Sequence, residues 1–236
     1  MPVKLLVIIP CYNEQEALPG VLSGLKQLTL PADYQIEILV INDCSTDATL
    51  KVAHQHKITV IDLPINLGIG GAVQSGLIYA LQNNFDLAVQ MDGDGQHPPA
   101  ELPKLLASYG ISEANLTIGS RFITNQGFQT SAARRLGIKY FHWLNKLFTR
   151  QYIYDSTSGF RLFDRQAIKL AAEHYPDEYP EPESLVLFAR AGLTITETPV
   201  LMAERNGGRS SIRNVTSLYY CIKVTIAMLF SAMRKI

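Results

Sequence analysis

One segment, DLAVQMDGDGQ at residues 86–96, joins a short apolar run to two carboxylates that flank a glycine. The apolar run is short for a helix and has the composition of a strand that is buried on both faces. Strands of that kind occur in parallel sheets that helices cover on both sides. The segment therefore predicts an α/β fold with Asp92 and Asp94 at the carboxyl end of a strand, where open α/β sheets bind ligands.

Similar strands alternate with helical patterns in the first half of the chain. The predicted strands are residues 4–9, 37–41, 59–63, 86–91 and 116–119. The predicted helices are residues 14–28, 45–54 with Ser45 as N-cap, 68–82, and 99–108 with proline in the first turn. This alternation indicates a mostly parallel sheet with right-handed crossovers. Three polar clusters follow strands and should meet at one edge: residues 10–14, 42–47 and 92–96.

The alternation ends after Arg121, and the later segments are interpreted as insertions on the side of a second substrate. They are a basic helix at 132–150, a turn at 155–161, a proline-rich acidic loop at 175–183 and an apolar helix at 217–236.

Composition excludes several classes of protein. A chain of 236 residues with 47% hydrophobic content can bury one large core. Basic and acidic residues balance at 21 each, so no overall field attracts nucleic acid, and anion binding must come from local clusters. The three cysteines lack metal-ligand spacing and predict reduced thiols in a cytosolic chain. The apolar run at 3–9 is too short for a signal peptide, so export is not expected.

The carboxylates of Asp92 and Asp94 are the strongest candidates for chemistry. A flexible glycine between them lets both face one cation, and hard oxygen ligands suit Mg²⁺ or Mn²⁺ bridging to a diphosphate. An isolated Asp-x-Asp is more often a pair of solvated turn residues, and only its position after a buried strand favours the metal site.

Two further clusters carry open alternatives. Asp43 can accept hydrogen bonds from a base or ribose, whereas Asp47 is expected to cap the next helix. The glycines of residues 66–71 permit close approach either of a phosphate-bearing ligand or of a packed loop, and the sequence does not choose between them.

Cations and carboxylates suited to an acceptor follow. Arg121, Arg134 and Arg135 can bind an acceptor phosphate in a bidentate manner, and Arg121 ranks first because it follows a predicted strand end. Three carboxylates could remove a proton from an acceptor hydroxyl: Asp155, Glu181 and Glu183. A phosphate acceptor needs no base, because it is already anionic at neutral pH.

These motifs closely resemble glycosyltransferase family 2, especially its dolichyl-phosphate mannose synthase-like branch. The resemblance covers nearly the whole chain, and the matching segments are residues 9–14, 42–47, 66–71, 92–99, 119–121 and 155–161. It implies a GT-A fold with a catalytic domain at 1–213 and a C-terminal helix at 214–236, an inverting reaction and a UDP- or GDP-sugar donor. The stretch YPEPE at 179–183 resembles a subgroup linked to bacterial surface polysaccharides, which favours a polyprenyl phosphate over dolichol.

The resemblance also implies roles for single residues. The nucleotide is held by Pro10, Tyr12, Glu14 and Asp43, and the metal and diphosphate by Asp92, Asp94 and Gln96. Residues matching Arg121 and Arg134 approach the acceptor phosphate, and a loop matching Arg205 to Ser210 covers the donor. The predicted catalytic set is Asp94, Arg121, Asp155 and Glu183. Family members often carry serine or alanine in place of Gly93 or Gly95, and many continue into transmembrane helices.

The apolar helix at 217–236 is nearly long enough to span a bilayer, but Lys223 near its middle would cost about 3 kcal/mol on insertion scales. The expected place is therefore peripheral, at the cytoplasmic face of a membrane, with packing onto the catalytic domain or onto a small membrane protein as the alternatives.

The sequence thus predicts a metal-dependent inverting glycosyltransferase that moves a sugar from a nucleotide sugar to a polyprenyl phosphate or a glycan. A nucleotidyltransferase would need a glycine-rich basic loop after the first strand, which residues 10–14 do not provide. A catalytically silent nucleotide-sugar-binding scaffold for a membrane partner is the second alternative, and the paired carboxylates argue against it.

Overall fold

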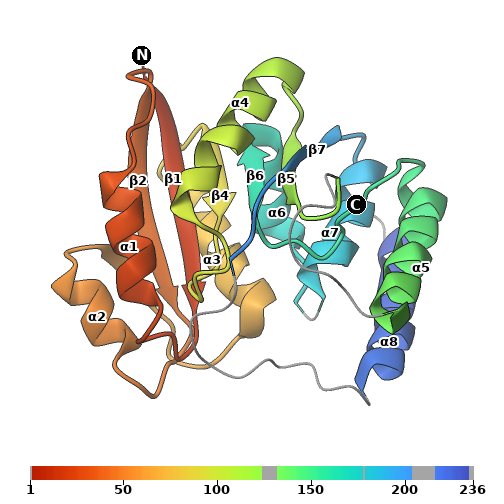
Figure 1. Ribbon diagram of the computed structural model, residues 1–236, viewed down its shortest axis with the longest axis horizontal. Coiled ribbons are helices and arrows are strands. Elements are labelled where there is room, and N and C mark those ends of the chain that lie inside the picture. Colours follow the sequence, from red (N-terminus) through yellow and green to blue (C-terminus); the bar gives the residue numbers. More distant parts are fainter. Residues whose placement is uncertain (1, 124–131, 178, 204–215, 234–236) are drawn as a thin grey trace.

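A central sheet organises the protein (Figure 1). The computed structural model describes residues 2–123, 132–177, 179–203 and 216–233, with the backbone alone for 132–139 and 216–221. The seven strands have the order β3-β2-β1-β4-β6-β5-β7. Their bounds are β1 Val3–Cys11, β2 Tyr34–Asn42, β3 Thr59–Asp62, β4 Leu87–Gln90, β5 Leu116–Ser120, β6 Arg161–Asp164 and β7 Ile195–Pro199. Only β6 runs antiparallel to its neighbours, so the predicted mostly parallel sheet is confirmed.

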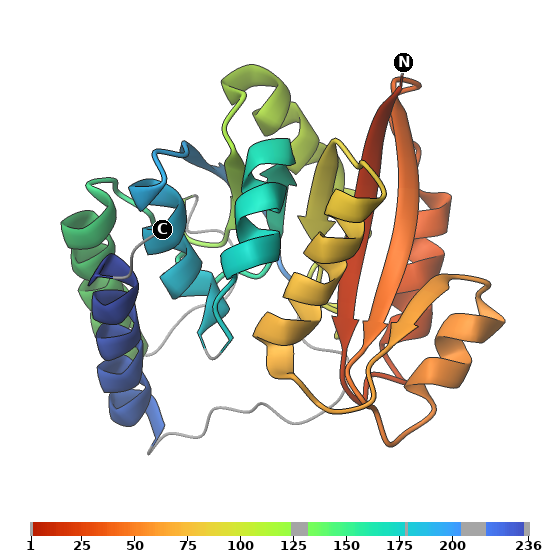
Figure 2. The same cartoon turned by 180° about the vertical axis from the view of Figure 1, so that it is seen from behind.

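Helices cover both faces of this sheet (Figures 1 and 2). Their bounds are α1 Leu18–Gln27, α2 Thr49–Gln55, α3 Gly68–Gln82, α4 Leu102–Ser112, α5 Ala132–Thr149, α6 Arg165–His174, α7 Pro180–Arg190 and α8 Thr216–Met233. Alternate residues of β1 face opposite cores: Leu6 and Ile8 pack with α3 and α6, whereas Val7 and Ile9 pack with α1 and α4. Burial on both faces explains why this strand is continuously apolar.

Several predicted boundaries were wrong for local reasons. Ser45 does not cap α2, because its hydroxyl accepts the amide of Asn13 and the helix starts four residues later. The N-cap position is Ala48, and Asp47 before it accepts the amide of Thr49 at 2.9 Å, so its carboxylate still satisfies a donor of the first turn. The predicted acidic loop at 175–183 contains the start of α7, whose Pro180 lies in the first turn, where a missing N–H costs nothing.

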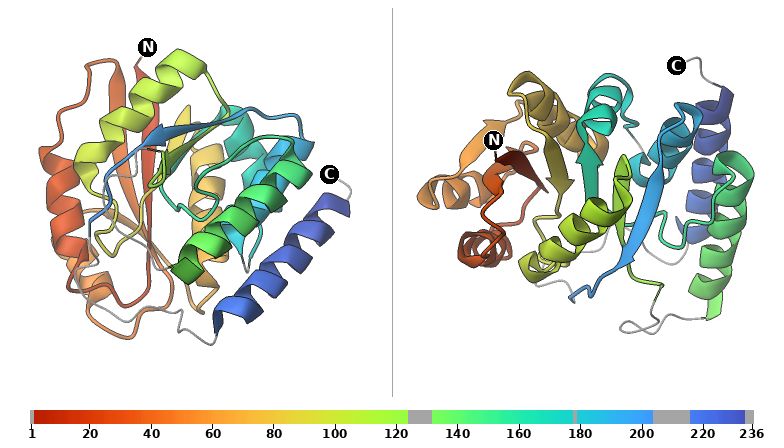
Figure 3. Two further views of the ribbon diagram at one scale, coloured as in Figure 1. Left: turned by 45° about the vertical axis from the view of Figure 1, so that its right-hand side comes forward. Right: turned by 90° about the horizontal axis from the view of Figure 1, so that it is seen from above.

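The helices α5 and α8 lie side by side at the end of the molecule away from α1 and α2 (Figure 3). They pack on α7 through an apolar cluster of Phe141, Leu144, Val186, Val224 and Met228. Within the described part of the chain, the helices lack the combination of length and apolar character that crossing a membrane requires.

Candidate active site

Three polar loops meet at the carboxyl edge of the sheet, as predicted. The loops after β1 and β2 are joined directly: Ser45 Oγ accepts the amide of Asn13 at 3.0 Å, and Asn13 Oδ1 accepts the amide of Thr46 at 2.8 Å. The loop after β4 begins where the amide of Met91 donates to the carbonyl of Ile8 at 3.0 Å. The β1 and β2 loops therefore form one braced platform, and the Asp92–Gln96 loop lies next to it.

The predicted nucleotide residues divide by exposure. Tyr12 is half exposed at the edge, whereas Pro10 is buried within β1 and Glu14 is partly buried. Asp43 is 3% exposed, and its two carboxylate oxygens accept the amides of Leu67 at 2.7 Å and Gly68 at 2.9 Å. Asp43 thus satisfies backbone donors at the start of α3 that have no intrahelical partner. Its nucleotide role stays a prediction.

Packing explains two glycines near the site. A Cβ at Gly70 would lie 2.3 Å from the carbonyl oxygen of Pro176, so this glycine lets α3 approach that loop. A Cβ at Gly93 would lie 2.6 Å from Cys11 Sγ, so Gly93 brings the Asp92–Gln96 loop against β1. Close packing, rather than flexibility between the carboxylates, accounts for Gly93.

The paired carboxylates occupy different environments. The Asp92 side chain is 31% exposed, whereas Asp94 is 8% exposed and its Oδ1 accepts the amide of Gln96 at 3.0 Å. The backbone of Gly159, in the turn before β6, comes close to Asp92, since a Cβ there would lie 3.0 Å from its Oδ1. A backbone hydrogen bond therefore fixes Asp94, and the backbone of Gly159 lies close to Asp92.

His97 is a site residue that sequence reasoning missed. Its ring is buried, stacks on Phe160 with centroids 5.1 Å apart, and lies with Nδ1 3.0 Å from the amide nitrogen of Asp92. Burial lowers the pKa of His97 to about 4, so at neutral pH the ring is uncharged and Nδ1 accepts this amide. The 3.6 Å approach to the Asp92 carboxylate is then not an ion pair. The position of His97 three residues after Asp94 is the signal that the sequence offers.

Acidification should reduce stability through His97. In the unfolded chain its pKa is about 6.5, against about 4 when folded, so between these values the unfolded state binds more protons and stability falls as pH falls. The full loss is about 3 kcal/mol, at one pKa unit per 1.36 kcal/mol. Urea unfolding of the wild type and His97→Asn between pH 7 and 4.5 measures it, because the asparagine side chain keeps an acceptor but does not titrate. The exposed His54→Asn is the control and should keep the wild-type slope; equal slopes for wild type and His97→Asn would contradict the assignment.

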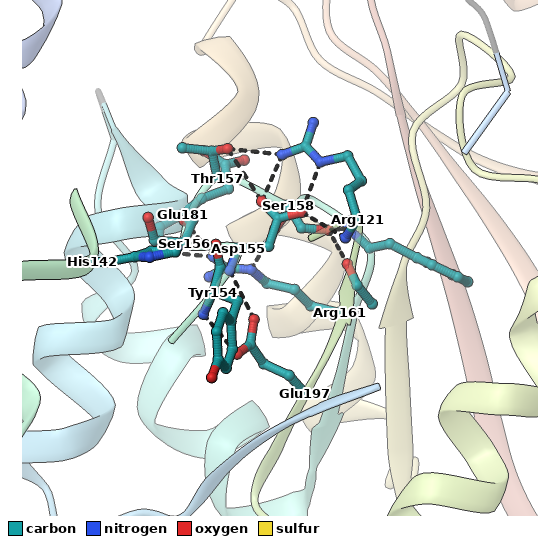
Figure 4. Close-up of polar contacts among 12 residues, drawn as sticks. Arg121, His142, Tyr154, Asp155, Ser156, Thr157, Ser158, Arg161, Glu181 and Glu197 are labelled. Atoms are coloured by element: carbon teal, nitrogen blue, oxygen red, sulfur yellow. Dashed lines mark hydrogen bonds and ion pairs between the residues drawn. The ribbon is translucent and has the colours of Figure 1, made fainter. Parts of the chain in front are cut away.

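A buried ion pair forms the other half of the site (Figure 4). The Asp155 carboxylate is fully buried and accepts Arg121 Nε at 2.7 Å, Arg121 Nη2 at 2.6 Å and the Arg121 amide at 3.0 Å. Glu197 of β7 fixes this turn, because its two oxygens accept the amides of Tyr154 at 2.7 Å and Asp155 at 2.8 Å. The prediction that Asp155 is a general base does not fit this geometry, since its oxygens are taken up by Arg121. Asp155 instead orients Arg121, whose side chain keeps 26% of its surface exposed.

Arg161 is a structural centre of the site that the sequence did not reveal. It is fully buried, and it donates to the carbonyls of Ser156, Ser158 and Glu181 and to the hydroxyl of Ser184. These bonds connect the turn at 155–161 to the first turn of α7 (Figure 4). Such a network cannot be inferred from the arginine's position in the chain.

The two acidic residues of α7 face different surroundings. Glu183, predicted as catalytic, lines a surface hollow with Ala227, Phe230 and Ser231 of α8, and its catalytic role stays a prediction. Burial raises the pKa of Glu181, Arg161 opposes the rise and Asp92 adds to it.

Some predicted residues are not placed. Arg205 and Ser210 lie outside the described residues, and for Arg134 and Arg135 only the α5 backbone is described. Among the described side chains, no three or more histidines, cysteines and carboxylates gather as a metal site.

The chain is similar to known proteins in both sequence and structure. The family model described as glycosyl transferase family 2 matches residues 6–170. Undecaprenyl-phosphate mannosyltransferase of Micrococcus luteus is 31% identical, over 89% of this chain and 87% of the relative. Polyprenol monophosphomannose synthase of Mycolicibacterium smegmatis is 30% identical, over 89% and 81%. Glucosyl-3-phosphoglycerate synthase of Mycobacterium tuberculosis, solved with Mn²⁺, UDP-glucose and phosphoglyceric acid, shares the fold with a TM-score of 0.73 at 18% identity, over 99% and 81%.

Proposed function

This chain belongs to glycosyl transferase family 2, and we propose that it transfers one sugar from a nucleotide sugar to the phosphate of a polyprenyl phosphate at a membrane surface. One observation carries the proposal: the Asp92–Gln96 loop and the anchored Arg121 lie at the same edge of the sheet, one suited to a cation and diphosphate, the other to a phosphate. The names of two relatives, an undecaprenyl-phosphate mannosyltransferase and a polyprenol monophosphomannose synthase, support this acceptor.

The donor side fits a divalent cation. Asp92 and Asp94 offer hard oxygen ligands, which suit Mg²⁺ or Mn²⁺, and the exposed third of the Asp92 side chain leaves it accessible. We assign the cation to Asp92, Asp94 and Gln96, and the nucleotide to Pro10, Tyr12, Glu14 and Asp43, with Arg205 and Ser210 on the covering loop. When bound, the cation would stabilise the charge of the departing nucleoside diphosphate.

The acceptor side fits a phosphate better than a hydroxyl. A phosphate monoester has a second pKa of about 6 and needs no base, which agrees with an Asp155 that is committed to Arg121 and a Glu183 that faces α8. Arg121 binds the acceptor phosphate in this proposal, together with Arg134 and Arg135. An oxygen of the acceptor phosphate then attacks the anomeric carbon of the donor sugar. The bond between that carbon and the nucleoside diphosphate breaks as the new bond forms, which inverts the anomeric configuration.

A thermal-shift experiment tests the donor half. A ligand at 100 times its Kd adds about 2.7 kcal/mol of stability, which raises the Tm by roughly 5–10 °C for a domain of this size. We expect one family of nucleotide sugars to give this shift with Mn²⁺ or Mg²⁺ present, and a smaller shift in EDTA. If no UDP- or GDP-sugar shifts the Tm, the proposal that this chain binds a nucleotide-sugar donor is wrong. Transfer of labelled sugar to a short-chain polyprenyl phosphate then tests the acceptor half and excludes a silent scaffold.

A further inference from the structure

The balanced total charge hides a strong segregation along the chain. Residues 132–154 contain five lysines and arginines, residues 205–236 contain six, and neither segment contains a carboxylate side chain. All 21 acidic residues therefore lie in the remainder of the chain, which has only ten basic ones. The two basic segments include the helices α5 and α8, and among the described side chains Lys146, Arg150 and Lys223 carry this charge.

These two helices form one continuous face. Phe141 and Leu144 of α5, and Val224 and Met228 of α8, point inward to the cluster with Val186 of α7. A hydrogen bond of 2.7 Å between the hydroxyls of Tyr140 and Thr225 ties the two helices together. Figures 1 and 3 show them side by side at the end of the molecule away from α1 and α2.

The outward side of this pair is apolar and basic. On α5, Trp143 is 60% exposed and Leu147 is 57% exposed, next to the exposed Lys146 and Arg150. On α8 the exposed apolar residues recur at helical spacing and are Ile222, Ile226, Leu229, Phe230 and Met233. Scattered exposed apolar residues are ordinary, but a large contiguous group on adjacent helices marks a surface that binds something.

We propose that the α5–α8 face docks the protein on an anionic lipid bilayer, with both helices lying in the headgroup region. Apolar residues interleaved with lysine and arginine are the chemistry of an interfacial helix pair. Neither helix has a carboxylate side chain of its own, and the neighbouring Glu183 of α7 shares a hollow with Phe230 and Met233. Each basic residue near an anionic surface improves partitioning about fivefold. A second copy of the chain fits less well, because two such faces would bring like charges together. This deepens the proposed function, since a polyprenyl phosphate acceptor lies in a bilayer, but the docking itself requires neither donor nor acceptor.

Vesicle co-sedimentation of the full chain, without nucleotide or acceptor, tests the docking. Binding should be strong to vesicles that mix phosphatidylglycerol with phosphatidylcholine, weak to phosphatidylcholine alone, and reduced by salt. The variant Lys146→Gln with Arg150→Gln should bind the anionic vesicles about 30-fold more weakly. The variant Trp143→Gln with Phe230→Gln should lose at least about tenfold, because it removes two apolar side chains from the face.

Matched controls lie on other faces of the same chain. Ile111 on α4 is 88% exposed, and Lys51 and Lys169 are exposed on α2 and α6. Ile111→Gln, and Lys51→Gln with Lys169→Gln, should bind vesicles as the wild type does. The proposal would be overturned if the wild type bound anionic and neutral vesicles equally well. It would also be overturned if the test and control variants lost vesicle affinity to the same extent.

Light scattering tests whether this face instead joins two copies of the chain. A dimer that dissociates in the Trp143→Gln/Phe230→Gln variant, with vesicle binding unchanged, would make this face an interface between copies and overturn lipid docking. The thermal shift with nucleotide sugar distinguishes failure of the docking proposal from failure of the proposed function. If the chain binds nucleotide sugar but not vesicles, only the docking proposal is wrong. If it binds vesicles but not nucleotide sugar, only the proposed function is wrong.

Discussion

Replacing Asp94 by asparagine should reduce sugar transfer by about a thousandfold or more, which corresponds to roughly 4 kcal/mol of transition-state stabilisation. The asparagine has the size of the aspartate, and its carbonyl can still accept the amide of Gln96, so the loop should keep its shape. What disappears is the negative charge that would hold a divalent cation against the diphosphate. Single-turnover transfer of labelled sugar, with saturating donor and Mn²⁺, measures the effect.

The same strand supplies the control for this prediction. Asp86 precedes β4 at its opposite end, where its carboxylate accepts the amide of Lys4 at 2.9 Å. Asp86→Asn removes a charge of the same kind far from the predicted cation and should transfer sugar at nearly the wild-type rate. Near-normal turnover by Asp94→Asn under these conditions would mean that the cation assignment is wrong.

The sequence predicts the fold well where strands are fully buried. β1, the second half of β2 and β4 are nearly continuous apolar runs, because each is covered on both faces. β6 and β7 escape prediction for physical reasons. β6 has four residues and carries Arg161 and Asp164, whose polar groups are satisfied by partners outside the strand. Within the described residues β7 pairs only with β5, and its sequence ITETP alternates polar and apolar residues before a proline.

The candidate site can be predicted in outline but not in its supporting contacts. The order of strands places residues 10–14, 42–47 and 92–96 at one edge, and that much follows from the parallel topology. The hydrogen-bond partner of a buried polar group cannot be predicted from the strand order. It depends on which residues, distant in the sequence, lie next to that group in the folded chain. Asp43 meets α3, Asp155 meets Arg121 and His97 meets the Asp92 amide only after the chain has folded.

The distribution of charge along the chain is more informative than its total. Equal totals of 21 suggest the absence of a useful field, whereas the carboxylate-free segments at 132–154 and 205–236 carry about half of all the basic residues. Net charge describes a whole chain, but binding responds to the charge that lies within about one Debye length of the partner, about 8–10 Å at ordinary salt. A count by segment is therefore the better measure of a docking surface.

Replacing Arg121 by methionine should lower the free energy of unfolding and reduce sugar transfer. We expect the combined effect to be the largest of any single change at the acceptor side. Removing one partner leaves the carboxylate of Asp155 buried without its cation, which costs about 3–5 kcal/mol in buried pairs. We expect the low end, about 3 kcal/mol, because a quarter of the Arg121 side chain is exposed and water can reach the remaining charge. Urea unfolding at pH 7 measures this loss, and Arg121→Lys, which keeps the charge, should lose less.

The kinetics of Asp155→Asn then separate orientation from base catalysis. If Asp155 orients Arg121, the variant should raise the acceptor KM about tenfold, leave the shape of the pH–rate profile unchanged, and add little to Arg121→Lys in the double variant, because both act on one contact. A general base would instead lower kcat with little change in KM, and its removal would abolish the acidic limb of the profile. Retention of tight acceptor binding by Asp155→Asn, with kcat alone reduced, would return Asp155 to the role of base and would favour a hydroxyl acceptor over a phosphate.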